Sequence, residues 1–118
     1  MTKIAIIGAG LSGLSAAHFL KDNAEITLFE KACDVSGRIS TRRAEPYFFD
    51  HGAQYFTART KAFQAFIQPL INQGIIERWG ARYVKFDSDQ IIERKNWIDE
   101  EPRYVGVPGM NKIAKYLA

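Results

Sequence analysis

The chain has 118 residues, 47% of them hydrophobic and 25% charged, so it can form one domain with a modest core. Its net charge of +3 is mild, and Lys and Arg are spread along the sequence, which excludes a nucleic-acid-binding stripe. No apolar run approaches the length of a membrane span, and the sequence starts without a secretory signal. We therefore expect a cytoplasmic protein that binds neither nucleic acid nor membrane. A single cysteine, Cys33, excludes an internal disulfide and suits a reducing compartment.

Residues 3–30 predict a strand, a glycine turn, a helix and a second strand that ends in an acid. Residues 3–7 form a short apolar run with three isoleucines, which is typical of a strand buried on both faces. A helix should follow to about residue 21, and residues 25–29 form the second strand. Glu30 then lies 22 residues after Gly8, close to the offset expected of an acid that binds a ribose 2′-hydroxyl.

The turn between the first strand and the helix has the pattern G-x-G-x-x-G. Gly8 permits the tight turn, Gly10 allows a pyrophosphate to approach the backbone, and Gly13 allows the helix to pack closely on the sheet. The amides of Leu11 and Ser12 lie at the helix N-terminus, where unpaired N–H groups and the helix dipole favour an anion. Together with the acid, these features predict a dinucleotide-binding unit, and a solvated acid at a strand end is the alternative for Glu30.

A polar loop follows Glu30 where a fold that binds NAD alone would continue into a second crossover helix. The loop contains Ser36, Gly37 and Arg38, and then the run 41–43, Thr-Arg-Arg. An arginine after a glycine suits a second contact on a pyrophosphate, because the guanidinium is permanently charged and forked. A basic surface loop is the alternative interpretation.

Residues 46–50 are aromatic and predict a short strand that leads into His51 and Gly52. The glycine suggests that the backbone passes close to something flat or bulky. His51 could act as a general base, and the alternative is a histidine held by hydrogen bonds for its shape.

Several motifs resemble the N-terminal part of the renalase-like flavoproteins, which belong to the flavin-containing amine oxidase superfamily. The motifs are GAGLSG, the Glu-Lys pair at 30–31, SGRISTRR and FDHGAQYFTAR, followed later by YVGVPGMNKIAKYLA. The resemblance runs from residue 3 to about residue 59 and again over residues 104–118. One departure is Ser36, where the family usually has the first glycine of GGR.

The resemblance implies FAD as the cofactor and places residues around it. Gly8, Gly10 and Ser12 would lie under the pyrophosphate, and Glu30 would hold the adenosine ribose. Arg38 would reach the cofactor from its loop, which we call the GR loop (residues 36–40), while Ala53 and Gln54 would lie against the isoalloxazine. The predicted cofactor set is Gly8, Gly10, Leu11, Ser12, Gly13, Glu30, Lys31, Gly37, Arg38, Ala53 and Gln54, with no metal ligand. Neither the motifs nor the spacing identifies a catalytic residue.

Residues 60–73 predict an amphipathic helix, because apolar side chains recur on one face from Phe63 to Ile71. Thr57 or Thr60 can cap its start and Gly74 its end, and Pro69 should bend it. Residues 75–79, 83–86, 90–94 and 104–107 predict short strands, with a turn at 87–89. A final helix has one apolar face.

We therefore expect an α/β protein with three parts. Residues 1–59 form a Rossmann-type FAD-binding half, residues 60–107 begin an antiparallel, β-rich substrate layer, and the helix in 108–118 returns to the FAD domain. A full renalase-like protein is several times longer, so the resemblance also implies an N-terminal piece of a larger enzyme.

Three functions remain open. In renalase-like enzymes the flavin takes a hydride from isomers of NAD(P)H reduced at the wrong ring carbon, and O2 reoxidises it to give hydrogen peroxide. The superfamily also implies amine oxidation as an alternative. A non-catalytic nucleotide-binding module is a third hypothesis, kept open by the short length. The substrate would be a small molecule, a dihydropyridine nucleotide or an amine.

Overall fold

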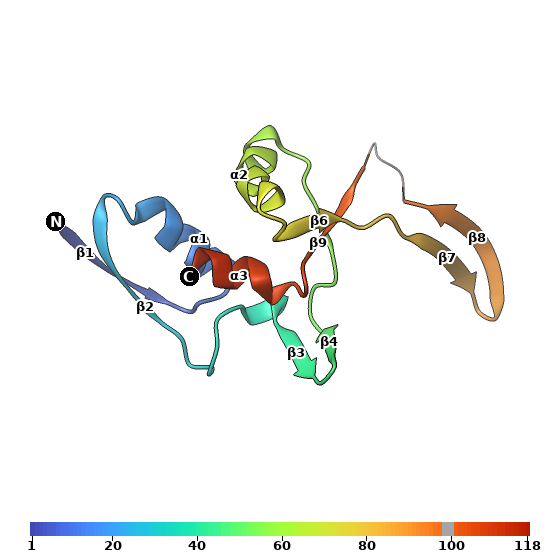
Figure 1. Cartoon of the computed structure of the whole chain (residues 1–118), viewed down its shortest axis with the longest axis horizontal. Coiled ribbons are helices and arrows are strands. Elements are labelled where there is room, and N and C mark those ends of the chain that lie inside the picture. Colours follow the sequence, from blue (N-terminus) through green and yellow to red (C-terminus); the bar gives the residue numbers. More distant parts are fainter. Residues whose placement is uncertain (98–100) are drawn as a thin grey trace.

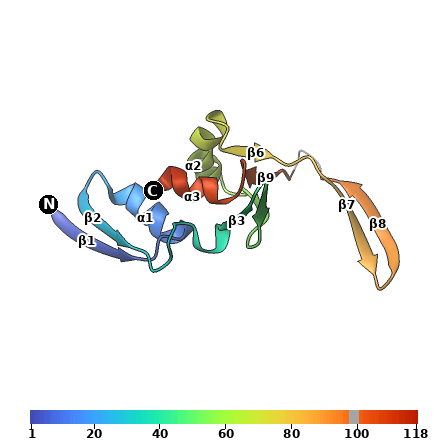
Figure 2. The same cartoon turned by 60° about the horizontal axis from the view of Figure 1, so that its bottom comes forward.

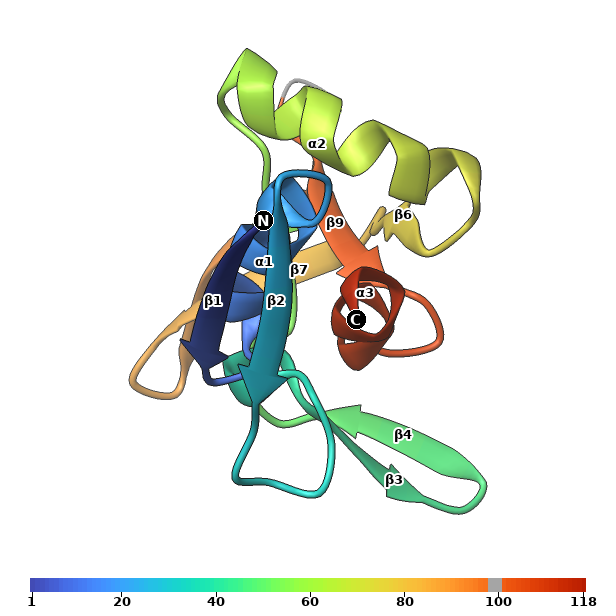
Figure 3. The same cartoon turned by 90° about the vertical axis from the view of Figure 1, so that its left-hand side faces the viewer.

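The computed structural model describes residues 1–97 and 101–118, which form a Rossmann-like α/β structure that is elongated, with extents of 59 × 33 × 26 Å (Figure 1). Strand β1 (Thr2–Ile7) and strand β2 (Ala24–Phe29) pair in parallel, with Ile4 opposite Ile26 and Ile6 opposite Leu28. Helix α1 (Leu11–Leu20) connects them and lies on one face of the sheet (Figure 3). The predicted strand–helix–strand unit is confirmed.

A hairpin that the sequence analysis missed follows β2. A short 3-10 turn, η1 (Gly37–Ile39), leads into strand β3 (Thr41–Ala44), which pairs antiparallel with strand β4 (Tyr47–Asp50). The expected strand at 46–50 is present, but placing residues 41–43 in a polar loop was wrong. The hairpin exposes nearly all of its side chains, so β3 lacks the apolar alternation by which a strand is detected in a sequence.

Helix α2 (Lys61–Asn72) begins and ends at the predicted signals. The Thr60 hydroxyl accepts a hydrogen bond from the Phe63 amide at 3.2 Å, as an N-cap does. At the other end Gly74 has φ +71°, and the Ile75 amide donates to the Leu70 carbonyl at 2.9 Å in a Schellman motif. Pro69 lies inside α2, which continues to Asn72; a bend at Pro69 remains a prediction.

Two antiparallel sheets complete the β-structure. The first has the order β5-β9-β6, formed by β5 (Phe56–Thr57), β9 (Arg103–Gly106) and β6 (Ile76–Arg78). The second is a hairpin of β7 (Arg82–Asp87) and β8 (Gln90–Asn96) that projects from the body (Figure 2). The Trp97 ring lies at the base of this hairpin. Its centroid is 4.9 Å from that of Tyr55 and 5.0 Å from that of Trp79. Antiparallel strands separate from the parallel pair agree with the expectation; β5 was not predicted.

The core lies where the three helices meet β6 and β9. Helix α3 (Asn111–Leu117) packs beside α1, and α2 covers β6. The apolar residues buried here are Ala9, Leu14, Ile39, Ile67, Leu70, Ile76, Tyr104, Met110, Ile113, Ala114 and Leu117. This core joins the nucleotide-binding unit to the antiparallel sheet, so the glycine turn and the later strands are held in one arrangement.

Candidate dinucleotide-binding site

The glycine turn has the geometry that its pattern predicts. Gly8 has φ +102°, a value that side chains disfavour, and its amide donates to the Phe29 carbonyl at 2.7 Å. A Cβ on Gly13 would collide with the Gly8 carbonyl oxygen and would lie 3.3 Å from Ile6 Cγ2. Close packing of α1 on the first strand therefore requires a glycine at position 13.

The GR loop is joined directly to this turn. The Ser36 amide donates to the Ala9 carbonyl at 3.0 Å, and Ser36 forms a parallel bridge with Gly10. A Cβ on Gly37, which has φ +59°, would lie 3.2 Å from Gly10 Cα. The two motifs, separated in the sequence, thus meet backbone to backbone.

Ser36 is a buried residue in an unfavourable backbone conformation. It has φ +133° and ψ −34° and is 5% exposed. A glycine would adopt this conformation without a Cβ penalty, which gives a physical reason for the glycine that GGR sequences have at this position.

The N-terminus of α1 is open. Leu11 and Ser12 are exposed, and the helix has Gly10 as its N-cap, with no side-chain cap hydrogen bond. The first amides of a helix have no intrahelical acceptor, so those of Leu11 and Ser12 are available to an anion.

Glu30 connects both ends of this region. Its Oε2 accepts a hydrogen bond from the Ala9 amide at 2.7 Å, and its Oε1 accepts one from the Ala32 amide at 3.0 Å. These amides, Ala32 first and Ala9 second, lower the pKa of the Glu30 carboxyl below its ordinary value. Glu30 is therefore a fixed, ionised carboxylate with lone pairs left for a hydroxyl donor.

The remaining predicted residues lie around the GR loop. Lys31 and Arg38 are exposed, and within residues 1–97 and 101–118 no ion pair of either side chain is found. The Arg38 carbonyl accepts a hydrogen bond from the Ala53 amide at 3.0 Å, and a Cβ on Gly52 would collide with that same carbonyl. The bulky neighbour expected beside Gly52 is thus the GR loop backbone. The Ala53 N–H is engaged by this bond and is not available to a ligand.

His51 is exposed, and its Nε2 lies 3.3 Å from Ser40 Oγ. The contact ties a second residue of the 50–54 segment to the GR loop. It agrees with the interpretation of His51 as a histidine held by a hydrogen bond, and the structure gives it no other polar side-chain partner among the described residues.

Gln54 lines a cleft of about 460 Å³ beside the β3–β4 hairpin. One wall is β4 and the other comes from β9 and the turn after it; the residues are Phe48, Phe49, Asp50, Gln54, Trp79, Val105, Gly106 and Pro108. We call it the aromatic cleft. The sequence analysis did not place Trp79, Val105 or Pro108 near Gln54, because only the pairing of β9 with β6 and its packing beside β4 bring them there.

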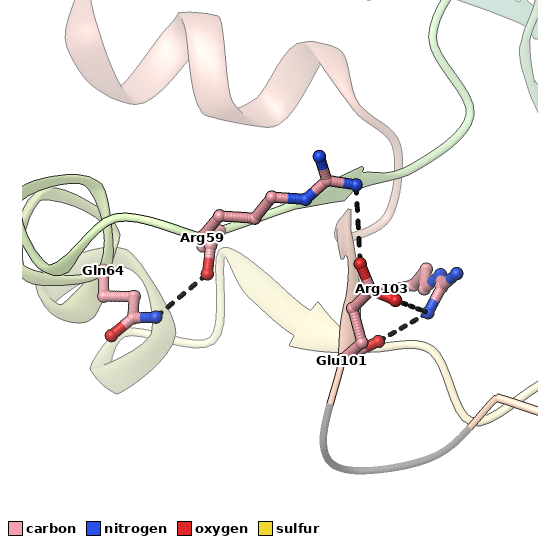
Figure 4. Close-up of polar contacts among 5 residues, drawn as sticks. Arg59, Gln64, Glu101 and Arg103 are labelled. Carbon is pink, nitrogen blue, oxygen red and sulfur yellow. Dashed lines mark hydrogen bonds and ion pairs between the residues drawn. The ribbon is translucent and has the colours of Figure 1, made fainter.

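A second, more polar cavity of about 490 Å³ lies between α2 and β9, away from the predicted cofactor residues. Arg59 faces Glu101 with an N–O distance of 3.4 Å, and Gln64 Nε2 donates to the Ala58 carbonyl at 3.0 Å (Figure 4). Arg103 Nη1 donates to the Glu101 carbonyl at 2.6 Å. None of the predicted cofactor set lines this cavity.

Residues 6–70 match the family described as NAD(P)-binding Rossmann-like domain. The chain belongs to this family. The match covers more than half of the sequence and includes every residue of the predicted cofactor set. Its description establishes the domain type and names no reaction.

Three relatives show which proteins contain similar segments. Coproporphyrinogen III oxidase from Staphylococcus aureus (strain NCTC 8325 / PS 47) is 41% identical over 63 residues, covering 50% of this chain and 14% of that protein. Prenylcysteine oxidase 1-like from Bos taurus is 31% identical over 103 residues, covering 81% and 20%. A 4,4'-diapophytoene desaturase from Staphylococcus aureus (strain bovine RF122 / ET3-1) is 43% identical over 51 residues, covering 42% and 10%.

A crystal structure assigned as a protoporphyrinogen oxidase, from Exiguobacterium sp. 255-15, superposes with a TM-score of 0.58 and 20% sequence identity. The superposition covers 76% of this chain and 21% of that one, and it supports the fold. The chain thus spans a fifth or less of the length of the three curated relatives.

Within the described residues, no helix has the length and apolar character needed to cross a membrane. The same residues contain no group of three His, Cys, Asp or Glu side chains arranged to hold a metal ion.

Proposed function

We propose that this chain is the FAD-binding portion of a flavin-dependent oxidoreductase. The observation that supports this best is the contact between Gly10 and Gly37, which places the GR loop against the glycine turn. The contact brings the backbone of the GR loop, which continues into the exposed Arg38, beside the turn that leads to the amides of Leu11 and Ser12. Both helix amides and a guanidinium are groups that bind an anion. A fold that binds NAD alone would have a crossover helix where this loop lies.

The geometry fits a diphosphate. A Cβ on Gly10 would meet nothing nearer than Gly37 Cα, at 4.0 Å, so Gly10 borders open space beside the N-terminus of α1. The lone pairs left on Glu30 can accept a hydrogen bond from an adenosine ribose, and its negative charge would repel a 2′-phosphate. The site thereby favours FAD over NADP.

The isoalloxazine end would lie toward the 50–54 segment and the aromatic cleft. When bound, FAD supplies a hydride acceptor that the protein side chains lack. Gln54 can orient a ring through its side-chain amide, and Phe48, Phe49 and Trp79 can exclude water from the cleft. Arg38 and Lys31, both exposed, can bind the cofactor's phosphates.

The proposed substrate is a dihydropyridine nucleotide, an NAD(P)H isomer reduced at the wrong carbon, with O2 as the final electron acceptor. This rests on the renalase-like motifs. Amine oxidation is the second candidate, because three aromatic side chains and the Asp50 carboxylate line one cleft, a set that also suits a cationic ligand. A non-catalytic nucleotide-binding module is the alternative outside enzymes.

The visible spectrum of the purified protein tests the cofactor. Flavin bands close to one per protein, and FAD in the supernatant after denaturation, are expected. Release of NAD(P) without flavin would contradict the proposal, and absence of any nucleotide would favour an interaction module. Anaerobic mixing then separates the substrates: bleaching by NAD(P)H isomers is expected, whereas bleaching by benzylamine or a polyamine alone would identify an amine oxidase.

A further inference from the structure

Asp50 and Thr41 hold the start of α3 from a distant part of the chain. Thr41 Oγ1 donates to Asp50 Oδ1 at 2.6 Å, and the same Oδ1 accepts a hydrogen bond from the Met110 amide at 2.9 Å. Thr41 Oγ1 in turn accepts one from the Asn111 amide at 3.0 Å. The contacts to α3 join residues 60 and 70 positions apart. We call this set the Asp50–Thr41 clamp.

The clamp supplies what α3 lacks by itself. Helix α3 has 7 residues and no side-chain cap of its own at Met110, and so short a helix is marginal without tertiary partners. The β3–β4 hairpin provides the Asp50 carboxylate and the Thr41 hydroxyl as acceptors for the amides at the start of α3. The approach is close, because a Cβ on Gly109 would lie 2.7 Å from Thr41 Cγ2.

The clamp also fixes the two walls of the aromatic cleft. Asp50 is the last residue of β4 on one wall, and Met110 lies two residues after Pro108, which belongs to the other wall. On the far side of Asp50, the bond between the Ala53 amide and the Arg38 carbonyl ties Gln54's segment to the GR loop. The side chain of Asp50 therefore links the β4 wall of the cleft to the segment that follows Pro108 on the other wall.

We infer that Asp50 is a positioning residue for the ring-binding end of the cofactor site, acting with Thr41 through the main chain of Met110 and Asn111. The inference rests on the proposed function, because it takes the aromatic cleft as the ring end of an FAD site. Among the described residues, no hydrogen bond joins Gly10 or Glu30, at the adenosine end, to the four clamp residues, so removal of the clamp should affect the two ends differently.

The test compares FAD with ADP, which engages the adenosine end alone. In the protein carrying Asp50→Ala, FAD affinity should fall by about tenfold, since hydrogen bonds to a charged group are lost, while ADP affinity stays within about twofold. The absorption maximum of the bound flavin should also shift. Asp50→Asn, which retains an acceptor oxygen, should recover part of the FAD affinity. Asp87→Ala, at the tip of the β7–β8 hairpin, is the control and should match the wild type for both ligands.

Thr41→Val keeps the shape of the side chain and removes its hydroxyl. It therefore still tests the clamp if Asp50→Ala unfolds the protein. Thr41→Val should lose FAD affinity and spare ADP affinity, and Thr41→Ser should behave as the wild type. Parallel loss of both ligands would overturn the inference and give the clamp a general stabilising role. Unchanged FAD affinity and spectrum in Thr41→Val and Asp50→Ala would overturn it and leave FAD binding standing. A wild type that binds ADP without FAD would overturn the proposed function together with it.

Discussion

Gly37 lies against Gly10 so closely that a methyl group on Gly37 would come within 3.2 Å of Gly10 Cα. The relationship explains why two glycine motifs far apart in the sequence are both needed. Gly10 borders the open space in front of α1, whereas Gly37 brings the GR loop beside it. Substitutions at the glycines of this site should therefore separate binding from folding.

Gly10→Val should abolish cofactor retention and leave the fold intact. Gly10 has φ −76°, which a side chain tolerates, and the added atoms would project into the space that a diphosphate needs. We expect FAD affinity to fall by at least about tenfold, or 1.4 kcal/mol, with thermal stability of the apoprotein unchanged.

Gly80→Val is the matched control, because a Cβ on Gly80 meets nothing within 4 Å and Gly80 lies outside the predicted site. Titration with FAD followed by flavin fluorescence, beside a thermal melt of each variant, gives both quantities. Full FAD affinity in Gly10→Val would place the diphosphate elsewhere.

Gly13→Ala should have the opposite effect and destabilise the protein. Its Cβ would overlap the Gly8 carbonyl oxygen, so α1 must move away from the sheet. Forced overpacking of this kind costs about 1–3 kcal/mol. Urea unfolding of the apoprotein measures it, and Ala16→Gly within the same helix gives the cost of an ordinary helical glycine for comparison. A midpoint equal to the wild type would show that α1 packs more loosely than described.

Ser36→Gly should stabilise the apoprotein. Ser36 has φ +133° in a buried position, and strain of this sort is typically about 1–3 kcal/mol. Glycine removes the strain, but it also raises the conformational entropy of the unfolded chain, which offsets part of the gain. The free energy of unfolding should therefore increase by about 1 kcal/mol. The same exchange in a regular helix, Ser15→Gly, should lower stability by about 0.5–1 kcal/mol. Denaturant titrations of both variants test the sign; a loss in both would contradict the strain argument.

Local signals predicted local structure well. Thr60 caps α2, Gly74 ends it, and Gly8 turns the chain, because each effect depends on a residue and its near neighbours. Strand β3 and the Asp50–Thr41 clamp were not predictable in this way. Thr41 is a strand residue because it pairs with Asp50. Both side chains accept hydrogen bonds from amides at the start of α3, which lie 60 and 70 positions further along the chain. Nothing in the polarity of residues 41–43 encodes those partners.

The candidate site also combines parts that the local sequence predicts with parts that only tertiary packing determines. The glycine turn and Glu30 were singled out by their spacing, and the GR loop by its residues, with a basic surface loop as the alternative, and then by the resemblance. The wall of the aromatic cleft formed by Val105 and Pro108 depends on how β9 pairs with β6, which is a tertiary property. The hydrogen bonds that Glu30 accepts from the Ala9 and Ala32 amides were not predicted, because an acid expected to bind a ribose has the same sequence signature.

Glu30 should make stability depend on pH. Amides of Ala32 and Ala9 stabilise its carboxylate and lower its folded-state pKa below the ordinary 4.5. A depressed carboxyl pKa contributes stability that is present above about pH 4.5 and is lost as pH falls through the folded-state value. Glu30→Gln should therefore be less stable than the wild type at pH 7, and the difference should shrink on acidification below about pH 4.5.

Urea unfolding of the apoprotein at several pH values measures this difference. Glu25→Gln is the control, because Glu25 lies on β2, the strand that ends just before Glu30, and its exposed partner, Lys3 at 3.6 Å, gives an ion pair of little energetic weight. A Glu30→Gln deficit that stays constant from pH 7 to pH 3 would show that packing, and not the charge, is responsible.

The face of the β1–β2 sheet opposite α1 should drive association of the 118-residue chain. Ile7 and Phe29 are partners in the register, and they are 82% and 53% exposed. Within residues 1–97 and 101–118 the sheet has two strands, so each strand also has an edge that no third strand of these residues covers. Apolar surface beside a free edge invites pairing with another chain. Replacing both residues with threonine keeps the strand propensity and removes most of the apolar surface, so it should reduce association.

Light scattering against protein concentration measures the effect. The double variant Ile7→Thr with Phe29→Thr should remain monomeric at concentrations where the wild-type chain associates. Lys3→Thr is the control on the same strand, because it removes a charge that protects the edge and leaves the apolar pair in place, so association should persist or increase. A wild-type chain that is monomeric throughout would show that this face is compatible with water at these concentrations. Equal association of the double variant would place the contact elsewhere, with the projecting β7–β8 hairpin as the next surface to alter.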